Sequence, residues 1–428
     1  MSINGKDLHA LASELFPLCR SVSSPENYQT LEILKEINAS MVIKSHEVGK
    51  QVFDWKVPKS WQLIEAKISD LKGKTLISTN TNNLHVVNFS QNFEGVVEFA
   101  ELEQHLYFDE QNYEAIPYVT SYYAESWGMC VSKRQYDEVL SQHSRLNVSI
   151  KVKFRHDLGM PYGEIVIPGK TQKEILLTTY ICHPSMANNE LSGPVIAIYL
   201  SRVIKDLDNY YSYRIIFVTE TIGAIAYISE NLSLLQERVI AGYVLTCLGD
   251  EGEFSYMLSP DENSLSDQLA EEFFMKSKIK FKKYSFLERG SDERQFNAHP
   301  LHLGIGNIMR TKYGEYRQYH TSLDDLSFIT KKGLKKSLET LTNFIDYIEN
   351  QKIYVPTVYL EPMMGKRGLF SNISRKGSQL NFLKLVDVIA YSNGKRSTRE
   401  IAKKIHLSHT DTLDIISLLL DHDLLVKL

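Results

Sequence analysis

Apolar residues recur three or four positions apart in several stretches of the chain, which is the spacing of an amphipathic helix. The stretch that begins at Pro25 shows the pattern well, because Leu31, Leu34 and Ile37 fall on one face and Ser24 stands at the N-cap position. Helices are predicted over residues 6–20, 25–41, 191–206, 222–233, 263–278 and 333–350.

Short runs of β-branched and aromatic residues alternate with these helices in the middle of the chain. From about residue 149 onward the runs are VSIKVKF, GEIVIPG, EILLTTYIC, YRIIFVT and RVIAGYVLTCLG. Runs that are apolar throughout are typical of strands buried on both faces, and their alternation with helices is typical of a parallel sheet. The pattern therefore predicts an α/β domain with a central, mostly parallel sheet that helices cover on both sides.

Residues 45–150 have a different texture, with short alternating runs separated by Asn, Lys and Gly turns. We interpret residues 55–140 as an inserted, mainly β domain within an α/β domain that comprises residues 1–54 and 141–355. The middle of this insertion, IPYVTSYYAESWGMCVS, is dense in aromatic residues. Such a segment forms either the core of the insertion or the rim of a binding cleft, and we favour the core.

The C-terminal segment, residues 356–428, is predicted to be a linker followed by a small domain. From residue 380 onward the pattern is helix, helix, helix and strand, which is similar to a winged helix-turn-helix. Residues 380–428 contain seven Lys/Arg and six acidic residues, and the third helix, SHTDTLDIISLLL, carries two aspartates and no basic residue. Because cations supply most of the non-specific affinity for DNA, no nucleic-acid partner is expected.

Composition places the chain among ordinary globular proteins. It has 428 residues, of which 43% are hydrophobic and 23% charged, and its net charge of -4 gives no bias toward nucleic acid or anionic membranes. Its four cysteines form no CxxC pair, which fits free thiols in a reducing compartment. Because the chain has neither an apolar run of about 20 residues nor a signal-peptide pattern, a cytoplasmic protein is expected.

Polar residues that are able to bind a metal stand where predicted strands end. His183 follows the apolar run 175–181, and Glu220 and Asp250 each follow a later strand. Ligand sites of open α/β sheets form at the carboxyl ends of the strands. Each residue also has a structural explanation. A lone His is more often a satisfied structural residue, a Glu at a helix start is a cap, and an Asp in a loop is a turn residue.

A second histidine supports the prediction of a metal site. His320 is followed four residues later by Asp324, in a stretch that also contains Tyr316 and Tyr319. Two histidines, each beside acidic residues at predicted sheet edges, are typical of zinc. This ion binds imidazole nitrogen and carboxylate oxygen, and catalytic zinc sites keep one position open for water.

The four stretches, in this order, resemble the zinc-dependent aminopeptidase superfamily. The superfamily pattern has a His at a strand end, an Asp-Asn-x-Ser-Gly loop, a Glu-Glu pair, an Asp after a strand and a late Tyr-His-Thr. A closer resemblance covers nearly the whole chain, in VFDWKVP, IPYVTSYY, CHPSMANNELSGP, ETIG, GSDERQF and RTKYGEYRQYHTSLDD. These motifs are similar to those of bacterial proteins with an aminopeptidase-like domain and a C-terminal winged helix, often encoded with polysaccharide-biosynthesis genes. The resemblance implies a three-layer, phosphorylase/hydrolase-like α/β fold with a mixed, mostly parallel sheet.

The resemblance also implies roles for single residues. His183 matches the first His ligand, His320 matches the last, and Glu220 matches the general base. Asn189 stands where the superfamily has a bridging Asp, and Thr221 replaces the second Glu, which is a ligand. Since two adjacent metal ions need bridging and flanking anions, one zinc ion is expected rather than two.

Neighbouring residues complete the predicted site. Glu190 is expected to supply the carboxylate ligand, although a shift of one residue at a helix start turns the side chain. Asp324 would orient the ring of His320. Asp292 is expected either to line the same cleft or to be a polar turn residue. Arg310 would neutralise an anionic substrate group, but a solvated surface position is the favoured interpretation. The residues expected behind the ligands or beside the substrate are Asn189, Asp250, Asp292, Asp324 and Arg310.

Two functions remain open. One is hydrolysis of an amide bond by zinc-activated water with Glu220 as the general base, on a peptide-like substrate or on a modified sugar of polysaccharide metabolism. The other is a non-catalytic binding or regulatory protein of the same fold, which the neutral side chains of Asn189 and Thr221 favour. The expected partners are a small-molecule or peptide-like substrate and a second copy of the chain in a homo-oligomer, without nucleic acid or membrane.

Overall fold

The structure is a computed structural model of the whole chain. For residues 378–381 it describes the backbone alone. The described residues form two compact units that divide between Phe344 and Ile345. The residues that the structure describes are 4–122, 124–349, 354–369, 378–394 and 396–427.

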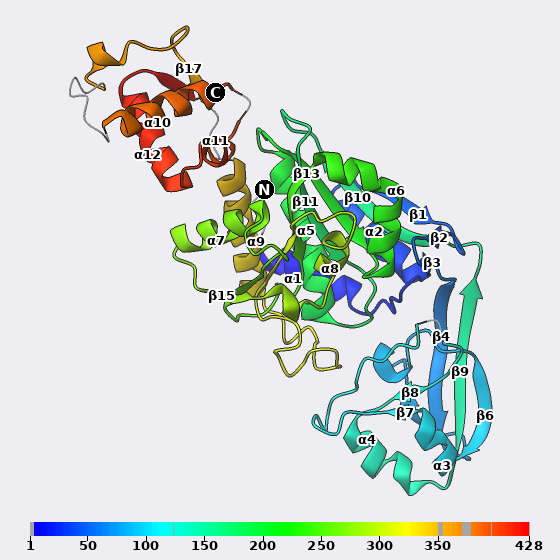
Figure 1. Cartoon of the computed structure of the whole chain (residues 1–428). Helices are drawn as coiled ribbons and strands as arrows, with labels where there is room; N and C mark the ends of the chain where they lie inside the picture. Colours follow the sequence, from blue (N-terminus) through cyan, green and yellow to red (C-terminus); the bar gives the residue numbers. More distant parts are fainter. Residues whose placement is uncertain (1–3, 123, 350–353, 370–377, 395, 428) are drawn as a thin grey trace. The chain divides into compact units, whose positions relative to one another are not determined.

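An eight-stranded mixed sheet is the centre of the N-terminal unit (Figure 1). The four central strands are parallel to one another, and β1, β10 and β14 add antiparallel pairings. Every residue of β11 and β12 is buried, which explains the continuous apolar runs that predicted these strands. In order across the sheet the strands are β1 (Val42–His46), β10 (Met160–Ile167), β12 (Ser212–Val218), β11 (Glu174–Tyr180), β13 (Val239–Leu245), β16 (Gly306–Met309), β14 (Phe254–Met257) and β15 (Phe281–Tyr284).

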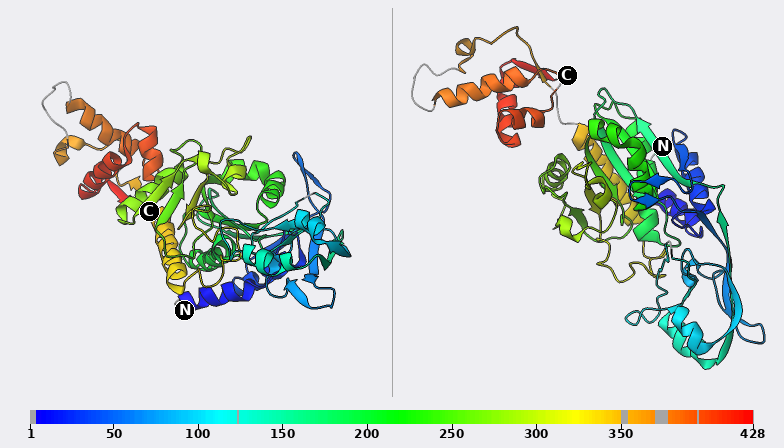
Figure 2. Two further views of the ribbon diagram at one scale, coloured as in Figure 1. Left: turned by 90° about the horizontal axis from the view of Figure 1, so that it is seen from below. Right: turned by 45° about the vertical axis from the view of Figure 1, so that its right-hand side comes forward.

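Helices cover both faces of this sheet (Figure 2). The main helices of the unit are α1 (Gly5–Leu15), α2 (Pro25–Ile37), α5 (Ser192–Lys205), α6 (Ile222–Arg238), α7 (Leu265–Lys276), the short α8 (Glu293–Phe296) and α9 (Lys331–Glu349). On β10, Tyr162 packs with Tyr227 of α6, while the next residue, Gly163, meets Leu31 of α2 on the opposite face. Because neighbouring residues of a strand point to opposite faces, α6 and α2 lie on different sides of the sheet, as the sequence predicted.

A second sheet of four antiparallel strands forms the inserted part of the unit, with its own hydrophobic core around Trp61 and Leu146. Its strands, in order, are β5 (Thr75–Ser78), β4 (Ser60–Ser69), β9 (Arg145–Arg155) and β6 (Phe93–Glu98). The run VSIKVKF was predicted to be a strand of the main sheet. That assignment is wrong, because β9 pairs with β4 and β6. A local pattern identifies a strand, but its partners are set by segments far away in the chain.

Shorter elements complete the N-terminal unit. They are the hairpin of β2 (Gln51–Val52) and β3 (Trp55–Lys56), the parallel pair β7 (Leu106–Tyr107) and β8 (Met129–Cys130), and the helices α3 (Phe99–Leu102) and α4 (Lys133–Glu138).

Segment 116–121 of the insertion lies along the segment that carries His320. Pro117 forms an antiparallel bridge with Thr321, and the N–H of Tyr118 donates to the carbonyl of His320 at 2.8 Å. This segment belongs to the aromatic stretch for which we favoured a core position. Met129 of that stretch does lie in the core of the insertion, whereas Tyr118 reaches the two histidines.

The C-terminal unit combines three helices with a two-stranded antiparallel sheet. Val388, Ile401, Leu419 and Leu424 are part of its hydrophobic core. The helix, helix, helix, strand order predicted for this segment is present, whereas Lys395, a basic residue of the predicted domain, lies outside the described residues. The elements are β17 (Tyr354–Pro356), α10 (Ser378–Tyr391), α11 (Thr398–Lys404), α12 (His409–Asp421) and β18 (Leu425–Lys427).

We expect the full chain to bind duplex DNA weakly. The third helix, α12, carries Asp411, Asp414 and Asp421 and has no Lys or Arg in its sequence, whereas each phosphate contact needs a cation. Fluorescence anisotropy of a labelled mixed-sequence duplex, titrated with protein at physiological salt, measures the affinity. Submicromolar binding that falls steeply as salt rises would contradict this prediction and would assign the C-terminal unit to DNA.

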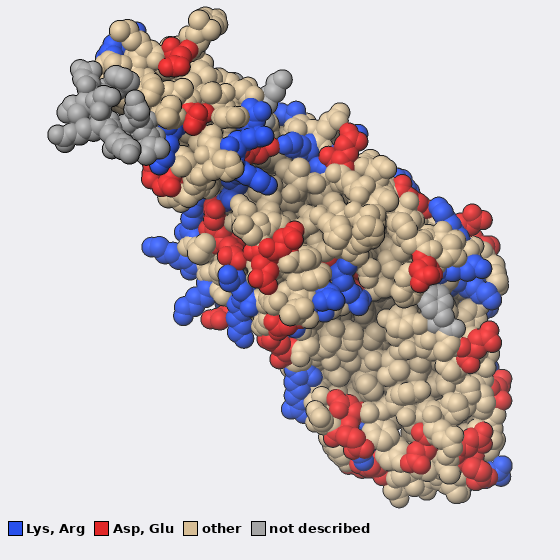
Figure 3. All heavy atoms as spheres, in the orientation of Figure 1, with Lys and Arg blue, Asp and Glu red and all other residues tan. Residues whose placement is uncertain are grey.

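The described part of the chain contains no helix that is both long and apolar enough to span a bilayer. The face drawn in Figure 3 has Lys and Arg interspersed with Asp and Glu. This mixture agrees with the small net charge of -4 and leaves no extended single-sign field on that face.

Candidate active site

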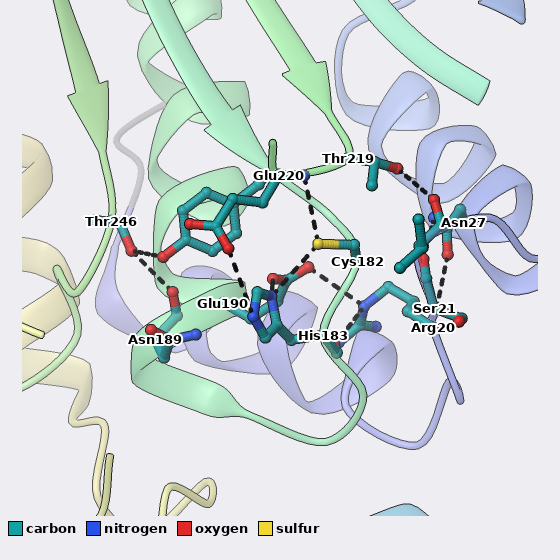
Figure 4. Close-up of polar contacts among 12 residues, drawn as sticks. Arg20, Ser21, Asn27, Cys182, His183, Asn189, Glu190, Thr219, Glu220 and Thr246 are labelled. Atoms are coloured by element: carbon teal, nitrogen blue, oxygen red, sulfur yellow. Dashed lines mark hydrogen bonds and ion pairs between the residues drawn. The ribbon is translucent and has the colours of Figure 1, made fainter. Parts of the chain in front are cut away.

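Three neighbouring strands bring the candidate residues to one edge of the main sheet (Figure 4). Cys182 and His183 follow β11, Glu220 follows β12, and Thr246 follows β13. Because β12, β11 and β13 are adjacent and parallel, their carboxyl ends lie side by side. The strand order therefore gathers these side chains although about 65 residues of chain separate the first from the last.

Asp324 braces the loop between β11 and α5. This loop contains a π-helical turn, η4 (Ala187–Leu191), whose residues are all buried. The Asp324 carboxylate accepts hydrogen bonds from the N–H of Asn188 at 2.6 Å and of Asn189 at 2.9 Å, which satisfies donors that lack a partner at the start of a helix. Burial raises the pKa of Asp324 to about 7, and these hydrogen bonds act in the opposite direction. Asp324 thus holds the turn, whereas the sequence assigned it to the ring of His320.

Asp250 and Arg310 brace a second loop. Asp250 accepts a hydrogen bond from the side chain of Asn188 at 3.0 Å. Arg310 is 3% exposed, donates to the carbonyl of Gly252 at 2.7 Å and lies over the ring of Phe254. Burial lowers the pKa of Arg310 below its usual range. The interpretation of Arg310 as a solvated surface residue is therefore wrong, because the guanidinium lies inside the fold.

Gly193 allows α5 to begin close to the sheet. A Cβ atom at this position would stand 2.4 Å from the carbonyl oxygen of Leu245 and 2.4 Å from the hydroxyl of Thr179. No side chain fits there without a shift of the backbone. The Gly of NNELSG therefore lets η4, with Glu190, pack against the ends of β11 and β13.

His183 is the centre of the site. Its Nδ1 lies 2.9 Å from Oε2 of Glu190, and its Nε2 lies 3.8 Å from Oε2 of Glu220 (Figure 4). The centroid of its ring is 5.3 Å from that of His320. The imidazole of His183 therefore stands between two carboxylates from neighbouring loops, with a second imidazole beside it.

The groups around His183 decide where its proton lies. Burial alone lowers the pKa of His183, but the contacts with Cys182 and Glu190 outweigh burial and raise this pKa well above 6.5. Burial raises the pKa of the Cys182 thiol to about 11, so the thiol is neutral at neutral pH. The contact of Nδ1 with Oε2 of Glu190 at 2.9 Å therefore favours a proton on Nδ1 of His183. Burial and the charge of His183 lower the pKa of His320 to about 3, so its ring is neutral.

Arg20, between α1 and α2, supplies a buried positive charge beside Glu190. Its Nε lies 3.6 Å from Oε1 of Glu190 and donates to the carbonyl of His183 at 3.2 Å, and its Nη1 donates to the carbonyl of Leu15 at 2.7 Å. The side chains of both Arg20 and Glu190 are 0% exposed. A buried carboxylate needs such partners to stay ionised. A continuous series of contacts therefore runs from Arg20 through Glu190 to His183.

The backbone after Glu220 is strained. Thr221 has a φ of 63° and a ψ of -82°, and the N–H of Ile222 donates to the carbonyl of Glu220 at 2.9 Å, which forms a γ-turn. The N–H of Thr221 donates to Asp292 at 2.8 Å, and Arg294 donates to the Thr221 hydroxyl at 2.7 Å. Strain of this kind persists where surrounding bonds enforce it, and it is concentrated at functional sites.

Glu220 and Asp292 form a pair of interacting acids, of which Asp292 is fully buried and the Glu220 side chain is 17% exposed. Burial raises the pKa of Glu220 above 4.5, while the charges of His183 and Arg294 act in the opposite direction. Burial and the negative charge of Glu220 raise the pKa of Asp292 well above 3.8. Two such carboxyl groups favour sharing one proton. Asp292, for which a polar turn was the alternative, thus lies beside the candidate general base.

Tyrosine rings surround the two histidines. The ring centroid of Tyr118 is 5.1 Å from that of His183 and 5.4 Å from that of His320. Tyr319 stacks on His320 at 4.0 Å, and Tyr180 lies 5.5 Å from His183. Aromatic walls keep bulk water from the polar groups they cover and offer faces on which a substrate packs. Because Tyr118 comes from the insertion, the inserted part contributes to the site.

Three residues of the site were missed in the sequence. Cys182, whose sulfur lies 3.4 Å from Nδ1 of His183, is the neighbour of that His, and this adjacency was the available signal. Tyr118 lies in the aromatic segment IPYVTSYY, whose density pointed to a cleft rim as one alternative. Arg20 is a single arginine between two helices, and nothing in its local sequence indicates a buried ion pair.

The donor atoms fit one zinc ion at His183. Among the described residues, Cys182, His183 and Glu190 are three ligating side chains whose donor atoms lie within 4.8 Å of one another, but Glu190 already contacts Nδ1 and Arg20. The Nε2 side of His183 faces Glu220, whose Oε2 lies 3.8 Å away. Two imidazoles on one zinc ion have ring centroids roughly 5 Å apart, given Zn–N distances of about 2 Å, and the observed separation is 5.3 Å.

A second ion does not fit in the same way. Asn189 and Thr221 are neutral at the two positions where adjacent ions would need anions. Asn189 is buried, and its Nδ2 has no hydrogen-bond partner. The donor set is therefore that of a site for a single ion.

Comparison with solved structures identifies the fold. The chain is similar to a zinc aminopeptidase from Bacillus subtilis, with 12% sequence identity, a TM-score of 0.59, and coverage of 81% of this chain and 95% of that chain. It is also similar to a peptidase M28 precursor from Shewanella amazonensis, with 12% identity, a TM-score of 0.55, and coverage of 84% and 98%. At these identities the likeness shows the fold. The predicted α/β aminopeptidase-like fold is confirmed.

The chain belongs to the family described as a domain of unknown function (DUF4910), which residues 9–351 match, and residues 352–427 match a winged helix-turn-helix family. A Clostridium acetobutylicum protein, provisionally named a polysaccharide biosynthesis protein with aminopeptidase-like domain, is 36% identical over 408 residues, which are 94% of this chain and 92% of the relative. A crystal structure from the same organism, provisionally described as a peptidase, has 34% identity, a TM-score of 0.83 and coverage of 99% and 96%. The predicted resemblance and the C-terminal winged helix are confirmed.

Proposed function

We propose that this chain is a hydrolase that cleaves an amide bond at His183 and Glu220 with the help of one zinc ion. The observation that carries the proposal is the position of His183, with Glu190 on its Nδ1 and Glu220 on its Nε2 side. A carboxylate that holds one imidazole nitrogen while the other faces the site is the usual arrangement of a metal-binding histidine. The aminopeptidase-like fold supports the same function, and so does the position of the site at the carboxyl ends of the sheet strands.

His183, through Nε2, and His320 would hold the ion. Glu190 was expected to be a ligand, but its contacts with Nδ1 and Arg20 support a role in orienting His183, and the remaining positions are left to water. When bound, zinc acts as a Lewis acid that polarises a carbonyl oxygen or a water molecule.

Glu220 is the residue that we propose to move the proton. Its carboxylate takes a proton from the attacking water and returns it to the leaving nitrogen of the amide. Burial raises the pKa of Glu220 above 4.5, which brings the group closer to the neutral range where a general base is efficient. The rings of Tyr118 and Tyr319 exclude bulk water from this transfer.

The substrate is an amide at a peptide N-terminus or on an acylated sugar. The names of the fold neighbours, which are zinc aminopeptidases, support a peptide. The name of the Clostridium acetobutylicum relative, which refers to polysaccharide biosynthesis, supports a sugar. Chromogenic release from a panel of aminoacyl anilides and N-acyl sugars, with and without a chelator, distinguishes the two.

We expect the purified protein to hold about one zinc ion per chain, because the donor set around His183 suits a single ion. Elemental analysis measures the content. His320→Ala should lose the ion while the fold stays intact, and His143→Ala, a change in the insertion away from both candidate histidines in sequence, should keep it. If no first-row metal binds even after zinc is offered, the proposed metal site is wrong.

The neutral side chains of Asn189 and Thr221 favour a second function, that of a non-catalytic binding protein with the same fold. In that case the zinc-loaded chain would bind members of the amide panel without releasing product. Turnover of any member that stops when the chelator is added would exclude this second function.

A further inference from the structure

A cavity of about 500 Å³ lies where the β2–β3 hairpin meets the inserted part of the chain. Such a volume is typical of small-molecule sites, which span about 300–1,000 Å³. Its wall includes the basic side chains of Lys56, Lys59 and His156, the rings of Phe89 and Phe154, and one carboxylate, that of Glu125. Apart from Lys56, none of these residues is in the active site or in its family motifs, so the proposed hydrolysis leaves the cavity unexplained.

The wall of this cavity combines an aromatic surface with basic groups. Phe89 and Phe154 meet edge to face with ring centroids 5.5 Å apart, and Trp61 lies behind Phe89 at 6.4 Å. Lys59 and His156 stand at the same cavity. Aromatic faces pack against the apolar face of a ring, and cations bind an anionic substituent. The cavity therefore suits a ring-shaped molecule with a negative charge.

The backbone holds Phe89 in an unusual conformation. Its φ is 72°, in the left-handed region that bulky residues rarely adopt. The preceding Asn88 is tied down, since its Nδ2 donates to the carbonyl of Arg20 at 3.1 Å and its Oδ1 accepts from the Ser21 hydroxyl at 2.5 Å. The Ser121 hydroxyl donates to the carbonyl of Phe89 at 3.1 Å. Residues kept under such strain are concentrated at ligand-binding positions.

The cavity adjoins the active site through one short segment. The N–H of Asn88 donates to the carbonyl of Val119 at 2.8 Å, and the residue before Val119 is Tyr118, which contacts both histidines. The residue after Asn88 is Phe89, which lines the cavity. An elongated substrate that reaches from His183 to the cavity would run along this segment.

We propose that this cavity binds an acidic sugar unit of the substrate whose amide is cleaved at His183 and Glu220. The sugar ring packs against Phe89 and Phe154, and its carboxylate or phosphate group is bound by Lys59 and His156. This inference rests on the proposed function, because it makes the bound sugar part of the molecule that is hydrolysed. The binding itself does not depend on turnover.

Ligand-observed NMR titrations of the full chain test the proposal with D-glucuronate, glucose 6-phosphate and uncharged glucose. The two acids separate a carboxylate from a phosphate, and at least one of them should bind at least about tenfold more tightly than glucose, the equivalent of one charge-assisted hydrogen bond. Lys59→Glu should weaken this binding by at least about tenfold. Lys72→Glu, the matched reversal at an exposed turn of the insertion, should leave it unchanged.

Equal affinity for glucose and for both acids, no binding of any of the three, or equal losses in the two lysine variants would each overturn the proposal. The titrations are repeated with Glu220→Gln, in which the cavity is intact, so binding is measured whether or not the chain hydrolyses anything. If hydrolysis is found and Lys59→Glu leaves KM for an acidic substrate unchanged, the subsite is refuted while the proposed function stands. If acid binding is found without hydrolysis, the proposed function is refuted while the subsite stands.

Discussion

Glu220→Gln should lower kcat for amide hydrolysis by about 10²- to 10⁴-fold, which is the usual contribution of a positioned general base. Glutamine has the size of glutamate but has no basic oxygen to accept a proton. The Glu220 side chain is 17% exposed and lies 3.8 Å from Nε2 of His183, so the amide fits without repacking. Steady-state kinetics on the best substrate of the panel measure the effect, and zinc content is determined in parallel.

The control is Glu237→Gln, an exposed change on α6, the helix that follows Glu220, which should leave kcat unchanged. An E220Q protein that holds zinc and keeps the full kcat would remove Glu220 from the role of base. Loss of zinc together with activity would instead assign the carboxylate to the metal ligands, and the base would have to be sought elsewhere, first at Asp292.

Arg20→Met should lower the free energy of unfolding by about 3–5 kcal/mol, because it leaves a buried carboxylate without its positive partner. Arg20 and Glu190 are both 0% exposed, so water does not replace the lost guanidinium. Burial lowers the pKa of Arg20 below its usual range, and the charge of Glu190 opposes this shift. Urea unfolding followed by tryptophan fluorescence measures the loss. All three tryptophans lie in the N-terminal unit, so the signal reports on the part that contains the pair.

Two comparisons show whether the effect belongs to the ion pair. Combining Arg20→Met with Glu190→Gln removes both charges and should destabilise the fold by less than the sum of the single changes. Arg134→Met removes one partner of the exposed pair with Glu114, whose side chains are 45% and 58% exposed, and should cost about 0–1 kcal/mol. Strict additivity of the two buried changes would contradict the assigned coupling.

The strand pattern was sufficient to bring two candidate residues together. His183 and Glu220 each follow an apolar run, and the runs that precede them form the neighbouring parallel strands β11 and β12. A residue at the carboxyl end of such a strand lies at one edge of the sheet whatever the rest of the chain does. His320 follows no strand directly, and its place beside His183 was implied by the family resemblance alone.

The sequence did not predict the direction in which the side chains of Glu190 and Asp324 point. Glu190 was expected to face the metal, and η4 turns it toward Nδ1 of His183 and toward Arg20. Asp324 was expected at the ring of His320, and it braces the backbone of η4. The first difference arises within one turn of helix, where a shift of one residue rotates a side chain by about 100°. The second is a contact between segments 136 residues apart in the chain. The spacing of residues in the sequence does not determine which way such a side chain points.

By itself, the sequence determined the α/β class, the aminopeptidase-like fold, the C-terminal winged helix and the edge of the sheet at which His183 and Glu220 meet. These follow from periodicity and from motifs, which are local properties of the chain. Only the tertiary structure decided that β9 pairs within the insertion, that Arg20 lies beside Glu190 and that Tyr118 covers both histidines. Each of these is a contact between distant segments, and such contacts are selected by the packing and burial of the whole fold.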